Sequence, residues 1–345
     1  MTALLEARHV TKIFGGGLFD RNVTVALEDF SMSIGDGEPT ITAIVGESGS
    51  GKTTLARLLL GIASATKGEV LYRGKNVAKL SGAEHRQFLR DVQVVFQDPF
   101  EVYNPFYKVD HVLTAPVKEF GLAKSREEMY SLIEEALETV GLRPDETLGR
   151  HPHQLSGGQR QRVMVARALV LKPRVILADE PVSMIDASLR ATVLASLQRL
   201  RQEFGISIVY ITHDLTTAYQ VSDSIVVLYR GSVAEVGDIT PVVQDPKHPY
   251  TRLLIGSIPE ADPDLPWSEE AAPALAGEKR GPAACKFADR CPSAMPKCLA
   301  ETPKLYQTDE HRAAACFLYE EAPVLKADDM DRVFRIKGAM AGLTR

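Results

Sequence analysis

The sequence predicts an α/β protein with a small cysteine-containing module near its C-terminal end. The first observation is a strand, a glycine-rich loop and a helix in direct succession between residues 41 and 60. The second is a set of further apolar strand patterns that end in polar residues, at 91–96, 175–180 and 206–211. The third is that all four cysteines lie between Cys285 and Cys316, which points to a local device in that segment.

Length and composition indicate a globular protein of two or three domains. The chain has 345 residues, of which 45% are hydrophobic and 25% are charged, which is ordinary for globular proteins. The formal net charge of −5 argues against a general affinity for nucleic acid. No apolar run is long enough to span a bilayer, and the first residues lack the apolar core of a signal peptide. We therefore expect a cytoplasmic protein that associates with a membrane only through a partner.

Residues 3–34 predict two strand-rich segments around a glycine turn. The segments are 3–14 and 25–34, and the turn is at residues 15–17. Phe14 lies just before the turn. An aromatic side chain there could stack on a nucleotide base, and a packing role within the hairpin explains it equally well.

Residues 46–53 fit the pattern G-x-x-x-x-G-K-[ST] of a phosphate-binding loop. Apolar residues before the loop predict a buried strand, and residues 54–60 after it are good helix formers. Glycines let backbone N–H groups turn toward phosphate oxygens, and a helix N-terminus adds partial positive charge. We assign Lys52 to the β- and γ-phosphates of a nucleotide and the Thr53 hydroxyl to Mg²⁺. The other residues expected at the nucleotide are Gly46, Glu47, Ser48, Gly49, Ser50, Gly51 and Thr54.

Three elements follow the loop and its helix: a strand and turn at 68–74, a polar helix at 81–90 and a buried strand at 91–96. The last of these strands ends at Gln97. From about residue 100 to 165 the pattern becomes helical, amphipathic and polar. This change of character predicts a helical insertion into the α/β domain.

A second helix N-terminus suited to an anion lies at the end of this insertion. Ser156, Gly157, Gly158 and Gln159 follow Leu155 and precede a strong helix pattern. A serine and two glycines at that place can cap the helix and leave its N–H groups accessible. Without context, the same residues are more often a plain loop and cap.

The strand at 175–180 ends in two carboxylates, Asp179 and Glu180. An aspartate at a strand end beside a phosphate-binding loop is the usual position for holding Mg²⁺ through water. Glu180 is then placed to orient or deprotonate an attacking water. A solvated acidic pair in a turn is the weaker interpretation, because four apolar residues precede the pair. Residues 186–204 predict a helix after it.

The strand at 206–211 leads to His213, and a closing hairpin follows at 224–236. A lone histidine is more often structural than catalytic. This one follows a strand of an α/β sheet, where ligands bind, so we expect it to contact the γ-phosphate.

With these residues placed, the chain resembles the nucleotide-binding subunit of an ATP-binding cassette (ABC) transporter over about residues 3–260. The family's motifs occur in the family's order, which is more specific than any one of them. The matches are Walker A at 46–53, the Q-loop at Gln97, the signature motif at 155–159, Walker B with its glutamate at 175–180, the D-loop at Asp186 and the switch histidine at His213. Phe14 falls where the family places its adenine-stacking aromatic.

The resemblance implies a P-loop NTPase cassette over residues 1–258, with a RecA-like core, an antiparallel β subdomain and a helical insertion. It implies that the chain hydrolyses ATP with Mg²⁺. The residues implied in catalysis are Lys52, Gln97, Glu180 and His213, and those implied around Mg²⁺ are Thr53, Gln97 and Asp179.

The resemblance also implies partners. Two cassettes of this family meet head to tail, so Ser156, Gly157, Gly158 and Gln159 would serve the nucleotide of a second ATPase subunit, most readily in a heterodimer. Asp186 would lie at that contact, where Met184 and Ile185 replace the Ala-Leu of many cassettes. The pair would dock beneath two membrane permease subunits at the cytoplasmic face of the inner membrane. An extracytoplasmic binding protein would deliver the solute, and no nucleic acid is involved.

The C-terminal part narrows the family. Residues 248–254 look like the segment that follows the cassette in oligopeptide and dipeptide importers, and residues 259–283 have the composition of a linker. Residues 284–345 are similar to the C-terminal module of those importers. We therefore expect an ATPase subunit that powers peptide import, with oligosaccharide or nickel import as alternatives.

A soluble ABC ATPase of DNA repair or translation fits less well, because the chain has one cassette, no sustained heptads and no basic face.

The four cysteines have the spacing C-x5-C-x6-C-x17-C. A disulfide is the weakest interpretation in a reducing cytoplasm. The spacing lacks the tight C-x2-C pairs of common zinc sites. Some peptide importers carry a [4Fe-4S] cluster in this module, so the resemblance implies one on Cys285, Cys291, Cys298 and Cys316, with zinc or free thiols as alternatives. His311 is more readily a surface histidine than a further ligand.

Overall fold

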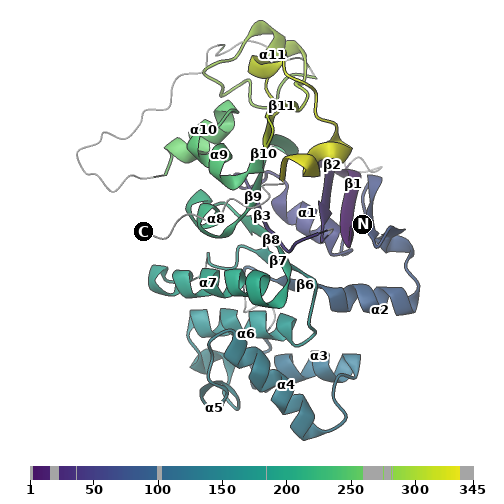
Figure 1. Ribbon diagram of the computed structural model, residues 1–345, viewed down its shortest axis with the longest axis vertical. Coiled ribbons are helices and arrows are strands. Elements are labelled where there is room, and N and C mark those ends of the chain that lie inside the picture. Colours follow the sequence, from purple (N-terminus) through teal and green to yellow (C-terminus); the bar gives the residue numbers. More distant parts are fainter. Residues whose placement is uncertain are drawn as a thin grey trace, which may run out of the picture.

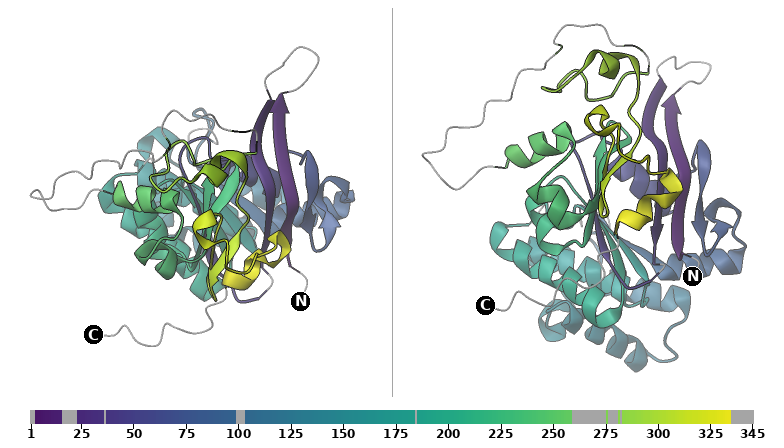
Figure 2. Two further views of the ribbon diagram at one scale, coloured as in Figure 1. Left: turned by 90° about the horizontal axis from the view of Figure 1, so that it is seen from above. Right: turned by 45° about the horizontal axis from the view of Figure 1, so that its top comes forward.

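The structure is a computed structural model, and it describes residues 3–15, 23–35, 37–98, 103–183, 185–258, 275, 281 and 283–334. Its centre is one large β-sheet with a smaller sheet beside it (Figure 1). Helices gather below and to one side of the large sheet, and the C-terminal segments lie at its upper end (Figures 1 and 2). The α/β class predicted from the sequence is confirmed.

The large sheet has eight strands in the order β11-β12-β10-β9-β3-β8-β7-β6. Strands β9, β3, β8, β7 and β6 are parallel to one another, and they consist almost wholly of buried apolar residues because both faces of the sheet are covered. Their bounds are β3 Ile41–Val45, β6 Val92–Val95, β7 Val175–Asp179, β8 Ser207–Thr212 and β9 Ser224–Tyr229.

The C-terminal part of the chain extends this sheet. Strand β10 (Ser232–Asp238) forms the predicted hairpin with β9 and pairs on its other side with β12 (Arg312–Ala314), which in turn pairs with β11 (Tyr306–Asp309). Residues more than 60 positions beyond the hairpin therefore share its backbone hydrogen bonds. The cysteine-containing segment is thus anchored to the main sheet from the C-terminal side.

The smaller sheet is antiparallel, in the order β2-β1-β4-β5. Its strands are β1 Leu5–Gly15, β2 Val23–Ile34, β4 Lys67–Tyr72 and β5 Lys75–Asn76. Helix α1 (Lys52–Leu59) contacts strands of both sheets, and its Leu55 and Leu58 are buried in the core that the two sheets share. This packing holds the start of α1 at a fixed place relative to the large sheet.

The predicted helical insertion is present as α3 (Asp110–Phe120), α4 (Arg126–Thr139), the short α5 (Pro144–Thr147) and α6 (Gly157–Leu169). Helices α3, α4 and α6 pack against one another below the sheet (Figure 1). Ser125 caps α4, because its hydroxyl oxygen accepts the Glu128 N–H at 3.1 Å.

The remaining helices connect or cover the strands. They are α2 Gly82–Asp91, α7 Ala187–Phe204, α8 Leu215–Val221, α9 Ile239–Gln244, α10 Pro249–Gly256 and α11 Pro296–Ala300. Short 3-10 turns lie at Val77–Lys79, Pro152–Gln154, Phe317–Tyr319 and Ala327–Phe334. Within the described residues, no helix combines the length and the hydropathy that a membrane span requires.

Candidate functional site

The loop between β3 and α1 has a backbone that only glycine adopts without strain. Gly46, Gly49 and Gly51 have φ angles of 155°, 79° and 107°. A Cβ atom on Gly46 would lie 2.2 Å from the carbonyl oxygen of Leu228, and one on Gly51 would lie 2.4 Å from that of Ala26. Both β9 and β2 therefore press against the loop and define its curvature.

The loop presents hydrogen-bond donors to an anion. Gly51 precedes α1 without a side-chain cap, so the N–H groups of the first turn, which have no partners within a helix, face the loop. The Ser50 hydroxyl is buried and has no hydrogen-bond partner among the described residues. Such a donor set fits phosphate oxygens, as the sequence pattern predicts.

Lys52 lies beneath this loop. Its ammonium group donates to the carbonyl oxygens of Gly46 at 2.6 Å and of Glu47 at 3.0 Å, and the residue is 7% exposed. Burial lowers the pKa of Lys52, while the carboxylates of Glu180, Asp179 and Glu47 act in the opposite direction. The cation is therefore held between the loop and a cluster of acidic groups, where a phosphate can approach it.

Asp179 is the last residue of β7 and Glu180 follows it. Burial, and next the neighbouring Glu180, raise the pKa of Asp179, against the positive charges of Lys52 and Arg57. Glu180 has a φ of 46°, which is a strained, left-handed conformation for a residue with a side chain. Its N–H donates to the carbonyl oxygen of Ile211 at 2.8 Å, so the pairing with β8 maintains this conformation.

Three side chains predicted to act in catalysis meet at Glu180. The Gln97 amide nitrogen donates to Glu180 Oε2 at 2.9 Å, and His213 Nδ1 lies 2.9 Å from Glu180 Oε1. Gln97, Glu180 and His213 follow β6, β7 and β8, which are neighbours in the sheet. Because parallel strands end at the same edge, residues far apart in the sequence converge on one carboxylate.

The residues expected at Mg²⁺ offer oxygen atoms of the kind this ion prefers. They are the hydroxyl of Thr53, the carboxylate of Asp179 and the amide oxygen of Gln97. The charge of Lys52 acts on Asp179, and helix α1, which begins at Lys52, contacts β7, which ends at Asp179. The donor set fits Mg²⁺ with one protein carboxylate.

The residues of the signature motif lie at the start of α6 in the helical region, away from the phosphate-binding loop and the strand ends described above. Ser156 and Gln159 form a capping box at the start of α6, with the Ser156 N–H bound to Gln159 Oε1 at 2.9 Å and the Gln159 N–H bound to Ser156 Oγ at 3.2 Å. A Cβ on Gly158 would lie 2.9 Å from Leu189, so the glycine permits close packing of α6 on α7. Gly157 opens the helix. These residues belong to the helical region, whereas α1 packs beside β1 (Figure 1).

Phe14 and Asp186 are both exposed. The Phe14 ring, at the end of β1, is 48% exposed, and the Lys12 ammonium lies 5.0 Å from its centroid. The ring is therefore not buried in the core. Asp186 precedes α7, and its carbonyl oxygen accepts the N–H groups of Leu189 and Arg190.

Two residues near the C-terminal end contact the loop, and the sequence analysis did not identify them. The Glu47 N–H donates to the Tyr250 hydroxyl at 2.9 Å, and the Glu47 carboxylate pairs with Arg290. The side chain and N–H of Glu47 are therefore engaged by the protein itself. No local motif marks these partners, because they lie 203 and 243 residues away in the chain.

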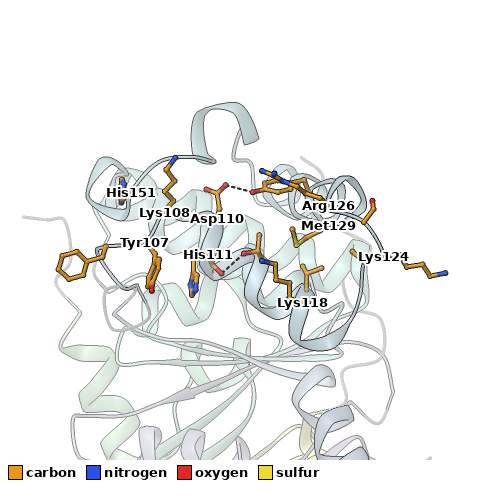
Figure 3. A pocket seen from close by; sticks show the side chains of 15 residues that line it. Tyr107, Lys108, Asp110, His111, Lys118, Lys124, Arg126, Met129 and His151 are labelled. Atoms are coloured by element: carbon orange, nitrogen blue, oxygen red, sulfur yellow. Dashed lines mark hydrogen bonds between the residues drawn. The ribbon is translucent and has the colours of Figure 1, made fainter.

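A broad groove of about 850 Å³ lies on the helical region, between the segment that precedes α3 and the start of α4 (Figure 3). Phe106 on its wall is 87% exposed, and the ring of Tyr107 stacks on that of His111 at 4.5 Å. Asp110 accepts from the Tyr130 hydroxyl at 3.3 Å and from the Gly149 N–H at 2.7 Å, which ties α3 to α4 and to the residues before α6. The groove thus combines a rigid frame with exposed aromatic side chains.

The four cysteines are free thiols. Burial raises the pKa of Cys316 to about 12 and also raises the pKa of Cys291, and the charges of the other cysteines add to both effects. Among the described residues, no group of three or more His, Cys, Asp or Glu side chains is arranged to hold a metal ion. The [4Fe-4S] cluster expected from the sequence is therefore not supported by this geometry. His311 Nδ1 lies 3.5 Å from Asp238 Oδ2.

Comparison with known proteins gives two family matches. The model for the ABC transporter family matches residues 27–183, and the model for the C-terminal region of oligopeptide/dipeptide transporters matches residues 234–298.

Individual proteins are similar over most of the chain. A putative oligopeptide transport ATP-binding protein of Bacillus subtilis, YkfD, is 39% identical over 323 residues, which cover 92% of this chain and 96% of the relative. The oligopeptide transport ATP-binding protein OppF of Salmonella typhimurium is 37% identical over 295 residues, which cover 84% of this chain and 87% of OppF. A solved dimeric structure of the ATP-binding cassette MJ0796, in a post-hydrolysis state with ADP and Pi, has a TM-score of 0.60 and 30% identity, and covers 68% of this chain and 98% of its own.

We predict that Gly46→Ala weakens nucleotide binding by tenfold or more, which is about 1.4 kcal/mol. The added Cβ would lie 2.2 Å from a backbone oxygen of β9, so the loop must leave its present curvature. Calorimetric titration with a non-hydrolysable ATP analogue measures the affinity, and circular dichroism checks that the variant folds. Gly82→Ala is the control, because nothing lies within 4 Å of a Cβ at that position. Wild-type affinity in folded Gly46→Ala would contradict the role of this glycine.

Proposed function

The chain belongs to the oligopeptide/dipeptide family of ABC transporter ATP-binding subunits, and on that premise we propose that it hydrolyses ATP to power peptide import through partner membrane subunits. The observation that carries the proposal is the convergence of Lys52, Gln97, Glu180 and His213 on the edge of the sheet at which the phosphate-binding loop lies.

We propose that Glu180 receives the proton of the attacking water or orients that water. Gln97 and His213 each hold one of its carboxylate oxygens at 2.9 Å, and the pairing of its N–H with Ile211 holds the strained backbone. Preorganised donors of this kind place a base without cost at the moment of reaction. His213 is 58% exposed, so it can also turn toward a γ-phosphate.

Lys52 is proposed to bind the β- and γ-phosphates, together with the N–H groups of the loop and of the first turn of α1. The phosphates would exchange with the carbonyl oxygens of Gly46 and Glu47 as partners of the ammonium group. Mg²⁺, when bound by Thr53, Gln97 and Asp179, supplies further positive charge for the phosphate oxygens. The exposed ring of Phe14 is proposed to stack on the adenine base.

We propose that two such cassettes form the working unit, with a related ATPase subunit as the second member. The capped N-terminus of α6, with Ser156, Gly157, Gly158 and Gln159, lies in the helical region and is suited to a nucleotide that another subunit presents. The exposed Asp186 at the start of α7 would lie at the same contact. The similar MJ0796 cassette is described as a dimer, which supports this arrangement.

The groove on the helical region is proposed to receive a cytoplasmic segment of a membrane permease subunit. Exposed aromatic side chains such as Phe106 and Tyr107 are suited to anchoring a partner helix, and Asp110 stiffens the wall behind them (Figure 3). This docking would place the subunit at the cytoplasmic face of the membrane. A binding protein outside the membrane would supply the peptide, as the membership of the family implies.

We propose separately that the four cysteines bind a [4Fe-4S] cluster in the working subunit. The support is the spacing of Cys285, Cys291, Cys298 and Cys316, together with the match of this segment to the C-terminal region of oligopeptide/dipeptide transporters. The described side chains are not arranged as a metal site, so binding would require the thiols to turn toward one another. Zinc and free thiols are the competing outcomes.

Glu180→Gln should lower the ATP hydrolysis rate by roughly 10²- to 10⁴-fold and leave ATP binding intact. The amide keeps the size of the side chain and can still pair with Gln97, but it accepts no proton from water. Steady-state hydrolysis by the assembled transporter and equilibrium binding of ATP measure the two properties. Glu134→Gln, on the exposed face of α4, is the matched control and should hydrolyse ATP at the wild-type rate. Normal hydrolysis by Glu180→Gln would remove the assignment of the general base.

The cargo is tested with the co-purified transporter in lipid, whose binding protein is loaded in turn with short peptides and with oligosaccharides. We expect peptides to stimulate ATP hydrolysis, because the proposed function couples hydrolysis to the import of peptides. Stimulation by sugars alone would show that the peptide assignment is wrong and would leave the hydrolytic site in place. Transporter that contains Glu180→Gln serves as the control and should show no stimulation.

Protein purified without air should contain about four iron and four sulfide ions per chain and should absorb visible light, if the cluster proposal is correct. Cys298→Ser should lose iron and colour, whereas Ser257→Ala, outside the module, should retain both. Colourless, iron-free wild-type protein would refute the cluster, and bound zinc in its place would support the structural-zinc alternative.

A further inference from the structure

We propose that Arg290 and Tyr250 are positioning residues for the phosphate-binding loop and that they set the affinity for ATP through Glu47. Both residues come from the part of the chain that follows the cassette motifs. The inference rests on the function proposed above, because it concerns the loop that would hold the ATP phosphates. It gives the C-terminal module a direct role at the nucleotide site.

The two contacts hold Glu47 at its backbone and at its side chain. The Glu47 N–H donates to the hydroxyl oxygen of Tyr250 at 2.9 Å, and Arg290 Nη1 donates to both carboxylate oxygens, at 2.9 and 3.0 Å. Glu47 is the second residue of the loop, and its carbonyl oxygen accepts from Lys52 and from the Ser50 N–H. Fixing Glu47 therefore fixes the turn on which the phosphate donors lie.

A buried aromatic cluster determines where Arg290 and Tyr250 stand. Tyr229, Tyr250 and Phe287 are each no more than 5% exposed, and their ring centroids are 4.4 to 5.6 Å apart. The Arg290 guanidinium lies 5.9 Å from the centroid of Phe287. Tyr229 ends β9, Tyr250 lies in the first turn of α10 and Phe287 belongs to the cysteine segment, so the cluster joins three parts of the chain and contacts the loop through the Tyr250 hydroxyl.

The charge on Arg290 matters because Glu47 is acidic and lies close to the phosphate site. The Lys52 ammonium lies 3.0 Å from the carbonyl oxygen of Glu47, and the Glu47 carboxylate acts electrostatically on the same ammonium, so its charge lies close to the proposed phosphate site. An unpaired carboxylate there would repel ATP. Arg290 neutralises this charge and holds it on the side of the module. The loop is thereby ordered before ATP binds, which lowers the entropic cost of binding.

Two other ion pairs hold the C-terminal module against the cassette, and neither includes a residue of the phosphate-binding loop. Arg230 pairs with Asp289 at 2.9 Å, and Lys286 pairs with Glu28 at 2.7 Å. Asp289 directly precedes Arg290, so Arg230 contributes to the same interface and provides a matched control. If Arg290 served only to dock the module, loss of Arg230 would have a comparable effect on ATP affinity.

The test is the ATP concentration dependence of hydrolysis by the assembled transporter, together with equilibrium ATP binding by the full-length chain. Arg290→Ala should raise KM and Kd for ATP about fivefold, as expected for the loss of one partly exposed charge pair, and should leave kcat nearly unchanged. The difference from wild type should shrink at high salt, because salt screens the exposed carboxylate. Arg290→Lys should restore most of the affinity, since a single nitrogen makes both contacts with Glu47. Arg230→Ala should leave KM within about twofold of wild type.

Further variants test whether Arg290 acts by neutralising the Glu47 carboxylate or only by packing against the loop. Adding Glu47→Gln to Arg290→Ala should return KM close to that of Glu47→Gln alone, because no carboxylate remains to repel ATP. Tyr250→Phe keeps the ring and removes the acceptor of the Glu47 N–H, so KM should again rise without loss of kcat. These variants keep the proposal open to refutation even if Arg290→Ala fails to fold.

The proposal is overturned if folded Arg290→Ala has the wild-type KM, or if Arg230→Ala raises KM as much as Arg290→Ala does. Failure of Arg290→Lys or of the double variant to recover affinity would also overturn it. A wild-type chain that neither binds nor hydrolyses ATP would instead refute the proposed function, so the two failures are distinguishable.

Discussion

The parallel pairing of β3 with β8 on one side and β9 on the other is the interaction on which the site depends. It places the loop after β3 between the ends of two neighbouring strands, one leading to His213 and the other pressing the Leu228 carbonyl against Gly46. Backbone hydrogen bonds set this register at every position, so the loop has little freedom to move relative to the sheet. The strand order then brings the ends of β7 and β6 to the same edge.

A strained backbone and a buried charge both lie at that edge of the sheet, and neighbouring residues stabilise each of them. Glu180 adopts a left-handed backbone conformation that its pairing with β8 maintains, and Lys52 is buried among acidic groups that oppose the lowering of its pKa. Neither arrangement is favourable in isolation. A rigid sheet with both faces covered can support such local costs, and active sites are where proteins commonly retain them.

The C-terminal part of the chain contributes more than an attachment to the cassette. Strands β12 and β11 extend the large sheet, and the cluster of Tyr229, Tyr250 and Phe287 contacts the loop through the Tyr250 hydroxyl. The segment that contains the cysteines therefore contacts the phosphate-binding loop, through the ion pair between Arg290 and Glu47.

The sequence alone predicted the elements and the residue types of the candidate nucleotide site, because those signals are local. The glycine pattern of the loop requires particular φ angles, the apolar runs predict buried strands, and Ser156 marks a helix start through a hydrogen bond that spans three residues. Only the tertiary structure decided which distant residues meet. The pairing of Gln97 and His213 with Glu180 follows from strand order, and the contacts of Glu47 with Tyr250 and Arg290 follow from how the last segments pack. Such contacts depend on packing across more than 200 residues of chain, for which a single sequence carries no periodic or local signal.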